Sequence, residues 1–259
     1  MLHSCKNSLK GRELHASIRS NTSTMLETAL VCMYGKLGDT ENAQDVFDNM
    51  CSRDLICWTT MITAYIEKGE SRNALRIFRL LEKEKIKPDE VCFVGILTAC
   101  ANLTSLNDGR EVHMQVVESG LESKLFISNA LLNMYGKCGS LDDAQTKFER
   151  SEHRNLVTWN TIIAACAQQG SAKEALRLFG QMEKEMIVPD QVTFVSILSA
   201  CVHEALLEEG RDCFETMILD FGIFPSIEHY GCMVDLLSRF GKLDEAEDLI
   251  FSMPIVPDG

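Results

Sequence analysis

The chain has 259 residues, 46% of them hydrophobic, and carries a formal net charge of −13 at pH 7. This apolar content suffices for a continuous core, and no run of about 18 apolar residues predicts a membrane span, so the disordered and membrane-spanning classes are excluded. The acidic charge disfavours unspecific attraction to nucleic acid or to an anionic membrane, and any nucleic-acid binding has to be explained against it.

The N-terminal segment, Met1 to Met25, holds four basic residues and one acid, which is a weak feature of organelle transit peptides. Within it, residues 11–15 (Gly-Arg-Glu-Leu-His) match the later residues 109–113 (Gly-Arg-Glu-Val-His). A match of this kind indicates a repeated element. We therefore interpret residues 1–23 as a degenerate partial repeat and expect no targeting signal in this segment.

An interval of 101 residues relates the following parts of the chain to one another. Trp58 returns as Trp159, and Cys100 returns as Cys201. Self-similarity at a fixed spacing is typical of a stacked repeat array. Each interval divides again into pieces of 31, 35 and 35 residues, each with its own recurring residues.

Residues 156–190 show how one repeat is built. The apolar positions of its first half recur at helical spacing and form one stripe, consisting of Trp159, Ile162, Ile163 and Cys166. Gly170 is predicted to end this helix, and Ser171 with Glu174 predicts a capping box at the start of a second one. Ser140 with Asp143 predicts a weaker box in the preceding unit.

Residues 55–89 follow the same pattern, and no segment shows the two-residue alternation typical of strands. Because a lone helical hairpin cannot bury both of its apolar faces, we expect hairpins stacked in series, with first helices on one face and second helices on the other. The first helices are almost neutral, whereas the second helices and turns carry most of the acid. The predicted fold class is therefore an all-α solenoid of helix-turn-helix repeats.

Eleven cysteines recur on these apolar faces, at equivalent positions such as Cys100 and Cys201. The sequence has no Cys-x-x-Cys motif and no two histidines three to five residues apart, so zinc ligation has no support. We interpret the cysteines as small core residues of a protein from a reducing compartment, and we expect no metal and no cofactor.

Four segments resemble pentatricopeptide repeat proteins, in the plant subclass (PLS) whose arrays alternate three repeat types. They are Asn129 to Leu141, Val157 to Ile163, Val192 to Cys201 and Glu228 to Leu237. In the register of that family, residues 1–23 form a partial long repeat. Seven complete repeats follow, namely 24–54 (short), 55–89 (standard), 90–124 (long), 125–155 (short), 156–190 (standard), 191–226 (long) and 227–258 (short).

The resemblance implies a right-handed superhelix that binds single-stranded RNA in a mitochondrion or chloroplast, one base per repeat. Each base is recognised by the fifth and the last residue of its unit, in the manner of helical-repeat proteins that use two or three side chains per base. Carried over to this chain, the guanine pairs are Thr28 with Asp54 and Thr59 with Asp89, the cytosine pair is Asn129 with Asn155, and the uracil pair is Asn160 with Asp190.

Three further pairs depart from the family's combinations and are assigned no base, namely Val94 with Lys124, Val195 with Ser226 and Gly231 with Asp258. The alternative for every polar pair is a helix cap or turn, since Asp89 and Asp190 follow prolines and could simply cap the next helix. The matched register of four polar pairs on a nearly uncharged face favours base recognition.

Two more residue sets follow from the resemblance. The second residue of each unit is expected to stack on bases, in the series Met25, Ile56, Val91, Phe126, Val157 and Val192, which Glu228 breaks. The alternative is ordinary core between repeats. Three cations at one register of the first helices, Lys36, Lys137 and Arg239, are expected to contact phosphates, or else to be solvated cations that favour the helix C-terminus.

We expect a site close to 5′-G-G-N-C-U-N-N-3′ and no catalytic activity. The His-x-Glu and Pro-Cys-x-x-Cys motifs of zinc deaminases are missing, so a role in cytidine-to-uridine RNA editing requires a deaminase in trans or a longer parent protein. The alternative function is a peptide-binding scaffold of the tetratricopeptide type. Its Trp-x-x-Leu-Gly-x-x-Tyr pattern is absent, and its uniform period does not suit pieces of 31, 35 and 35 residues.

Overall fold

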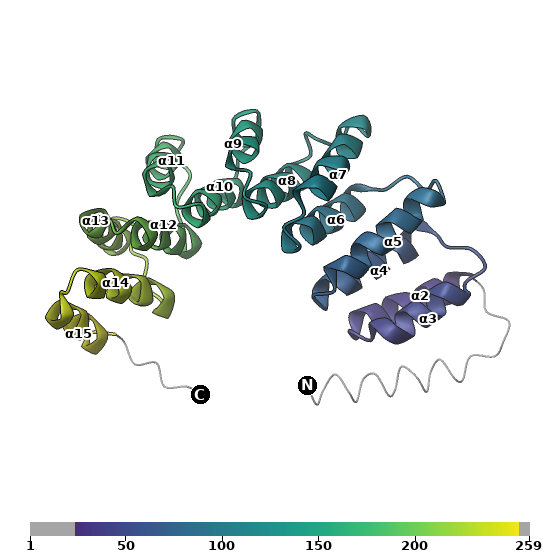
Figure 1. Ribbon diagram of the computed structural model, residues 1–259, viewed down its shortest axis with the longest axis horizontal. Helices are drawn as coiled ribbons and strands as arrows, with labels where there is room; N and C mark the ends of the chain where they lie inside the picture. Colours follow the sequence, from purple (N-terminus) through teal and green to yellow (C-terminus); the bar gives the residue numbers. More distant parts are fainter. Residues whose placement is uncertain (1–23, 254–259) are drawn as a thin grey trace. The chain divides into compact units, whose positions relative to one another are not determined.

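The computed structural model describes residues 24–253, so the predicted partial repeat at 1–23 and Asp258 lie outside the described residues (Figure 1). The described part is all-helical, which confirms the predicted class. Its helices are α2 (Thr24–Lys36), α3 (Thr40–Asn49), α4 (Leu55–Glu67), α5 (Ser71–Lys83), α6 (Glu90–Asn102), α7 (Leu106–Glu118), α8 (Leu125–Lys137), α9 (Leu141–Glu149), α10 (Leu156–Gln168), α11 (Ala172–Lys184), α12 (Gln191–Glu204), α13 (Leu207–Leu219), α14 (Ile227–Arg239) and α15 (Leu243–Phe251).

The even-numbered helices are the first helices of the hairpins, and their starts coincide with the starts of the units delimited by the sequence, apart from the partial repeat. The typing of these units as short, standard and long stays a prediction. No helix between residues 24 and 253 combines the length and the apolar character that crossing a membrane requires.

The chain forms two compact units that divide within α8, between Ala130 and Leu131. In the first unit, α2, α4 and α6 lie side by side, and α3, α5 and α7 pack behind them. In the second unit, α10, α12 and α14 form the corresponding row, and each packs against its own second helix, α11, α13 or α15. Within each unit, stacking therefore buries the apolar faces that a single hairpin would leave exposed.

An aromatic cluster joins the repeat at residues 24–54 to the repeat that follows it. The rings of Phe47 and Trp58 meet edge to face with centroids 4.8 Å apart, and the Arg53 guanidinium lies 4.8 Å from the centre of the Phe47 ring. Arg53 also donates hydrogen bonds to the carbonyls of Phe47 and Asp48, at 2.8 and 3.0 Å, and so caps the C-terminus of α3. The same cluster recurs 101 residues later, in Phe148, Trp159 and Arg154.

Most turns between paired helices place glycine in the left-handed conformation, while Thr104 and Ala205 take it in the turns α6–α7 and α12–α13. Gly69 and Gly170 have φ values of +80° and +65°, in the left-handed region that glycine adopts without a steric penalty. Gly170 therefore ends the first helix of its repeat, as its position in the sequence predicts.

The capping box predicted at Ser171 and Glu174 is wrong. The Ser171 side chain makes no capping hydrogen bond, and Glu174 binds Arg177 on the same helix at 2.7 Å instead. Ser140 likewise donates its hydroxyl proton to Asp143 and not to a cap. Capping boxes do occur, but at the starts of the first helices α10, α12 and α14.

Replacing Arg154 with alanine should lower the free energy of unfolding by about 1–3 kcal/mol, because two carbonyls at the end of α9 lose their donors and Phe148 loses its cation. Urea denaturation followed by circular dichroism measures the change. The control is Arg150→Ala at the same helix end, where the exposed side chain should contribute less than about 0.5 kcal/mol. Equal losses for the two variants would show that the cluster does not stabilise the fold.

Candidate nucleic-acid interface

The second residue of the first helices is exposed in every unit from α2 to α12. The exposed fractions of these six apolar side chains range from 55% for Val157 to 82% for Met25, with Ile56, Val91, Phe126 and Val192 between them. Core between repeats, the alternative proposed for these residues, is therefore wrong. Apolar side chains at this register are available to a ligand, while their role in stacking stays a prediction.

The last residue of a unit caps the first helix of the next unit. Asp54, Asp89 and Asp190 each accept a hydrogen bond from the backbone N–H of the third helical residue, at 2.9, 2.8 and 3.0 Å, and Asn155 does the same at 3.0 Å. The capping alternative is correct for all four. It does not compete with base recognition, because capping leaves a second carboxylate oxygen on each aspartate and the amide nitrogen on Asn155.

Two of the predicted pairs are in direct contact. The Asn160 amide donates from Nδ2 to Oδ1 of Asp190 at 2.9 Å. The Thr28 hydroxyl lies 3.5 Å from Oδ2 of Asp54, the oxygen that does not cap the helix, and it donates at 2.9 Å to the carbonyl of Thr24. The fifth and last residues of these units are therefore neighbours in space although 26 and 30 residues separate them in sequence.

The third helical residue takes part in the Asn160 pair. Thr193 is fully buried. Its hydroxyl oxygen accepts a hydrogen bond from the backbone N–H of Asp190 at 3.1 Å, and the hydroxyl donates to Oδ1 of Asn160, with 2.6 Å between the two oxygens. An Asp carboxylate can only accept hydrogen bonds, so the Asn160 amide must turn its nitrogen toward Asp190 and its oxygen toward Thr193. This arrangement fixes the orientation of the amide and leaves one amide proton for a ligand.

The pair Thr59 and Asp89 is not joined in this way. The Thr59 hydroxyl is buried and finds no hydrogen-bond partner among the described residues, so its link to Asp89 stays a prediction. Thr28 is only 8% exposed. Asn129 and Asn155 belong to the same repeat but lie in different compact units, and their pairing also stays a prediction.

One cavity of about 380 Å³ in the second unit brings three predicted residue sets together. Its lining includes the stacking residues Val157 and Val192, the pair Asn160 and Asp190, and the cation Lys137. The apolar side chains flank the polar pair, and the ammonium group lies at the same site. This volume lies in the range of about 300–1,000 Å³ that is typical of ligand sites.

The three predicted phosphate contacts differ in their surroundings. Lys36 and Lys137 are exposed and form no ion pair within residues 24–253. Arg239 is bound to Asp235 at 3.0 Å and to the carbonyl of Val202 at 3.1 Å, so it has to exchange partners before it can bind a phosphate.

In the last repeat, the buried residue His229 is the third residue of the first helix, a position that Thr193 or a cysteine occupies in three other repeats. Burial lowers the pKa of His229, which keeps the ring neutral.

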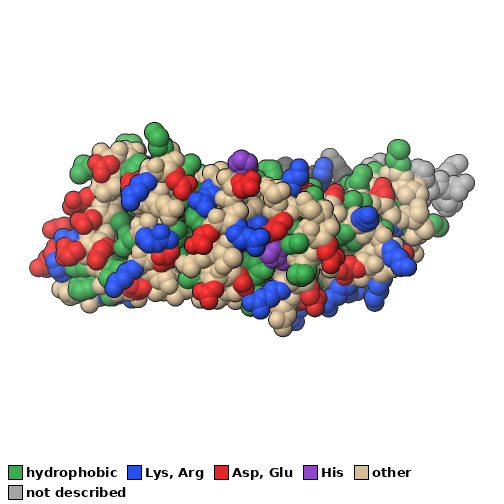
Figure 2. Space-filling model, turned by 90° about the horizontal axis from the view of Figure 1, so that it is seen from above, with side chains coloured by type: hydrophobic (Ala, Val, Ile, Leu, Met, Phe, Trp, Pro, Cys, Tyr) green, Lys and Arg blue, Asp and Glu red, His purple; other side chains and the backbone are tan. Residues whose placement is uncertain are grey.

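The described residues show no large patch of one charge in the view of Figure 2, no cluster of reactive cysteines and no metal-binding group. Figure 2 shows basic side chains interspersed with acidic ones over the face that it displays. Six of the ten described cysteines are buried, as predicted for small core residues, and burial raises the pKa of Cys92 to about 12. The described residues contain no group of three or more side chains able to hold a metal ion.

The sequence interpretation overlooked Thr193 and its equivalent Thr158. Each threonine stands three residues after an N-cap Asn or Asp and bonds back to that residue, which makes a reciprocal capping box. An Asn or Asp followed at the third position by threonine was a visible signal for the cap. The contact of Thr193 with Asn160 had no such signal, because 33 residues separate the two.

Repeat models match the chain in several places. The PPR repeat family matches residues 53–102 and 154–203, and the PPR repeat matches residues 28–55, 126–156, 192–220 and 228–254. Together these segments cover more than half of the chain.

Known proteins with similar sequences and folds carry the same repeats. The Arabidopsis thaliana pentatricopeptide repeat-containing protein CRR2, chloroplastic, is 41% identical over 96% of this chain, which spans only 39% of that protein. The crystal structure of PPR10 from maize has a TM-score of 0.78 at 18% identity, over 93% of this chain and 35% of its own. PPR10 in complex with an 18-nt psaJ RNA element has a TM-score of 0.64 at 22% identity, over 99% and 36%. At these identities the two structures establish the fold alone.

Two substitutions at Asp190 should show how much its helix cap contributes to the free energy of unfolding. Asp190→Asn retains an oxygen that can accept the N–H of Thr193, whereas Asp190→Ala removes it and should cost about 1 kcal/mol more in the free energy of unfolding. Urea denaturation of both variants measures the difference. Asp220→Ala, at an exposed helix end without a capping role, is the control. Identical stabilities of the alanine and asparagine variants would contradict the assigned cap.

Proposed function

The chain belongs to the pentatricopeptide repeat family, and from this premise we propose that it binds single-stranded RNA in a sequence-specific way, with one base per repeat. The fifth and last residues of each repeat recognise the base, and the second residues stack on it. The array is of the PLS type, as the ordered unit lengths of 31, 35 and 35 residues indicate. The family assignment also decides against a tetratricopeptide-type scaffold.

One observation carries the proposal, namely the cavity that Val157, Asn160, Asp190, Val192 and Lys137 line together. A nucleotide offers a flat apolar base, polar atoms on the base edge, and a charged phosphate. The cavity offers two exposed apolar side chains, an oriented amide beside a carboxylate, and an ammonium group. Each part of the nucleotide therefore has a complementary group within one site.

The chain's net charge of −13 is compatible with this function because the acid is unevenly placed. Stretches of the first helices, such as residues 91–103 and 157–169, hold no charged side chain. Helix layers lie about 8–10 Å apart, close to the Debye length of about 8 Å at physiological salt. Salt therefore screens much of the acidity on the second helices from RNA bound along the first helices.

The setting of this activity is RNA metabolism in an organelle. The relative CRR2 is named as chloroplastic, which supports a chloroplast or mitochondrion as the location. We assign the repeats a binding role and no catalytic one. In RNA editing they would select the site, and a deaminase in trans or in another part of a longer protein would supply the chemistry. PPR10, which shares the fold, has been crystallised with an RNA element, and this supports RNA as the ligand.

The proposed site 5′-G-G-N-C-U-N-N-3′ should bind more tightly than a copy with both guanines replaced by uracil. If each pair discriminates by about 1–3 kcal/mol, as good base contacts do, two lost pairs should weaken binding by at least tenfold. Fluorescence anisotropy at fixed salt measures both affinities. Absence of binding to either RNA would refute the proposed function, while equal affinities would refute the base assignments only.

Thr193 should act as a positioning residue for Asn160. Thr193→Val keeps the size of the side chain but removes the hydroxyl that holds Oδ1 of Asn160, so the preference for uracil at the fifth base should fall about fivefold, which corresponds to one hydrogen bond of about 1 kcal/mol. The readout is the affinity ratio between RNAs with uracil and cytosine at that base.

Thr193→Ser is the matched control and should retain the ratio. The guanine preference at the second base should not change in either variant, because Thr59 and Asp89 lie in the first compact unit and Thr193 lies in the second. An unchanged uracil preference in the valine variant would contradict the positioning role, even if the variant is less stable.

A further inference from the structure

Helix α5 carries more net positive charge than any other second helix between residues 24 and 253. Its side chains include four cations at spacings of four, three and four residues, which places them along one side of the helix, namely Arg72, Arg76, Arg79 and Lys83. All four are exposed, and the helix has a single acid, Glu82. A local positive surface therefore exists on the second-helix layer of a strongly acidic chain.

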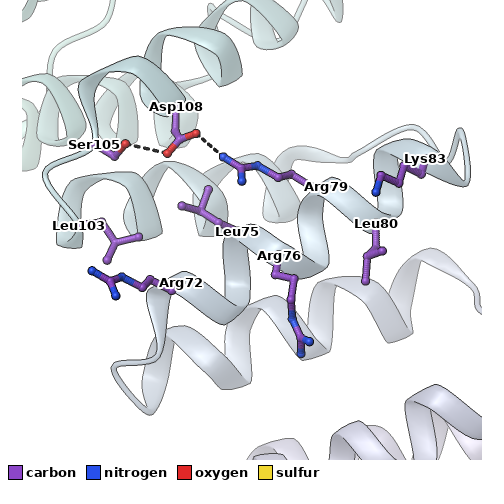
Figure 3. Close-up of a pocket in the computed structure, with 9 residues that line it drawn as sticks. All are labelled: Arg72, Leu75, Arg76, Arg79, Leu80, Lys83, Leu103, Ser105 and Asp108. Carbon is purple, nitrogen blue, oxygen red and sulfur yellow. Dashed lines mark hydrogen bonds and ion pairs between the residues drawn. The ribbon is translucent and has the colours of Figure 1, made fainter.

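These cations line a groove of about 560 Å³, called here the α5 groove (Figure 3). The remaining lining residues are Leu75, Leu80, Leu103, Ser105 and Asp108, from α5, from the turn between α6 and α7 and from the first turn of α7. Leu75 is buried, and Leu80 and Leu103 are partly exposed, so the groove has an aliphatic floor beside its charged rim.

Only one of the four cations is neutralised. Arg79 donates to Asp108 at 2.7 Å, and the other carboxylate oxygen of Asp108 accepts the Ser105 hydroxyl at 2.7 Å. Figure 3 shows Arg79 reaching Asp108 and Arg72 beside Leu103, with Arg76 pointing away from Asp108. Arg72, Arg76 and Lys83 form no ion pair in the described part of the chain. Arg72 and Lys83 are therefore left for an outside anion, and Arg76, whose side chain lies beside the Tyr65 hydroxyl, adds a third positive charge to the surface.

The repeat itself does not require this composition. At the positions 101 residues later, Gly180 replaces Arg79, Gln181 replaces Leu80, and Glu204 replaces Leu103. The equivalent helix α11 folds in the same hairpin arrangement with these residues. Arg79, Leu80 and Leu103 are therefore dispensable for the fold. The other positions recur, with Leu176 for Leu75, Arg177 for Arg76 and a lysine for Arg72 and for Lys83, so what distinguishes the α5 groove is the added Arg79 and the two added leucines.

We propose that the α5 groove binds an acidic, partly apolar segment of a partner protein. Carboxylates on one face of a helical segment match cations that repeat along α5, and leucine-like side chains match Leu75, Leu80 and Leu103. RNA is a poorer occupant, because the groove offers no aromatic side chain for a base and Asp108 repels phosphates. This proposal does not depend on RNA binding, which we assign to the first helices.

The test uses the 259-residue chain and two fluorescein-labelled helical peptides. The first carries glutamates and leucines on one face, and the second has glutamine in place of every glutamate. Anisotropy at low salt should show binding of the first peptide at least tenfold tighter than of the second, because charge-assisted hydrogen bonds to Arg and Lys are lost with the carboxylates. Non-specific attraction is disfavoured here, since peptide and protein are both acidic.

Two double variants with the same loss of charge locate the site. Arg72→Gln with Lys83→Gln should weaken binding of the glutamate peptide by about tenfold or more, whereas Lys173→Gln with Lys184→Gln, 101 residues later, should leave it unchanged. Circular dichroism checks that both variants fold.

Equal affinity for the two peptides would overturn the proposal, and so would equal losses in the two double variants. If Arg72→Gln with Lys83→Gln lowers the affinity for RNA and not for the peptide, the groove is a phosphate surface and the proposed partner is wrong. Failure of the proposed RNA function has a different signature, because RNA binding would then be missing in the unaltered chain.

Discussion

At four repeat boundaries the side chain that ends one repeat caps the first helix of the next, and the geometry of the interface depends on this constraint. The first N–H groups of a helix lack partners within it, so an oxygen at the N-cap has to lie within hydrogen-bond distance of the third residue. Asp54, Asp89, Asn155 and Asp190 all meet this requirement. Because the first helices of neighbouring repeats lie side by side, a side chain fixed in this way lies close to the fifth residue of its own repeat. The residues that we propose for base recognition are therefore also residues that stabilise the helices.

Much of the fold could be predicted from the sequence because its signals are local. The apolar stripe through Trp159 and the glycine at 170 gave the first helix of that hairpin, and the 101-residue interval extended the pattern along the chain. The error at Ser171 has a local cause too. Glu174 lies within reach of Arg177 one turn further on, and an ion pair between these two side chains replaces the expected bond to the backbone. The Ser-x-x-Glu pattern alone does not distinguish between these two partners.

The finer geometry of the site could not be predicted, since it depends on packing between repeats. The exposure of Val157 and Val192 was undecidable from sequence, because an apolar residue near a helix start suits a core and a binding surface equally well. The network of Asn160, Asp190 and Thr193 joins residues that are 30 and 33 positions apart. The third helical residue, which completes this network, differs between repeats, with Cys57 in contact with Thr28 at 3.0 Å in the place that Thr193 takes beside Asn160. Repeats with the same backbone therefore hold their fifth residues with different chemistry.

The two copies of the 101-residue interval distinguish residues that the fold needs from residues that serve one location. The cluster of Phe47, Arg53 and Trp58 recurs with the same contacts in the second copy, as expected for a structural element without which the hairpins would not pack. The caps at Asp89 and Asp190 recur as well, although the fifth residue is Thr59 in one repeat and Asn160 in the other, so the scaffold is kept while the fifth residue changes. Arg79 and Leu80 do not recur, and their helix packs in the same way as its copy without them. A residue that is absent from one of two equivalent helices cannot be required for their common fold, and this is the reason for assigning Arg79 and Leu80 to the partner surface that we propose.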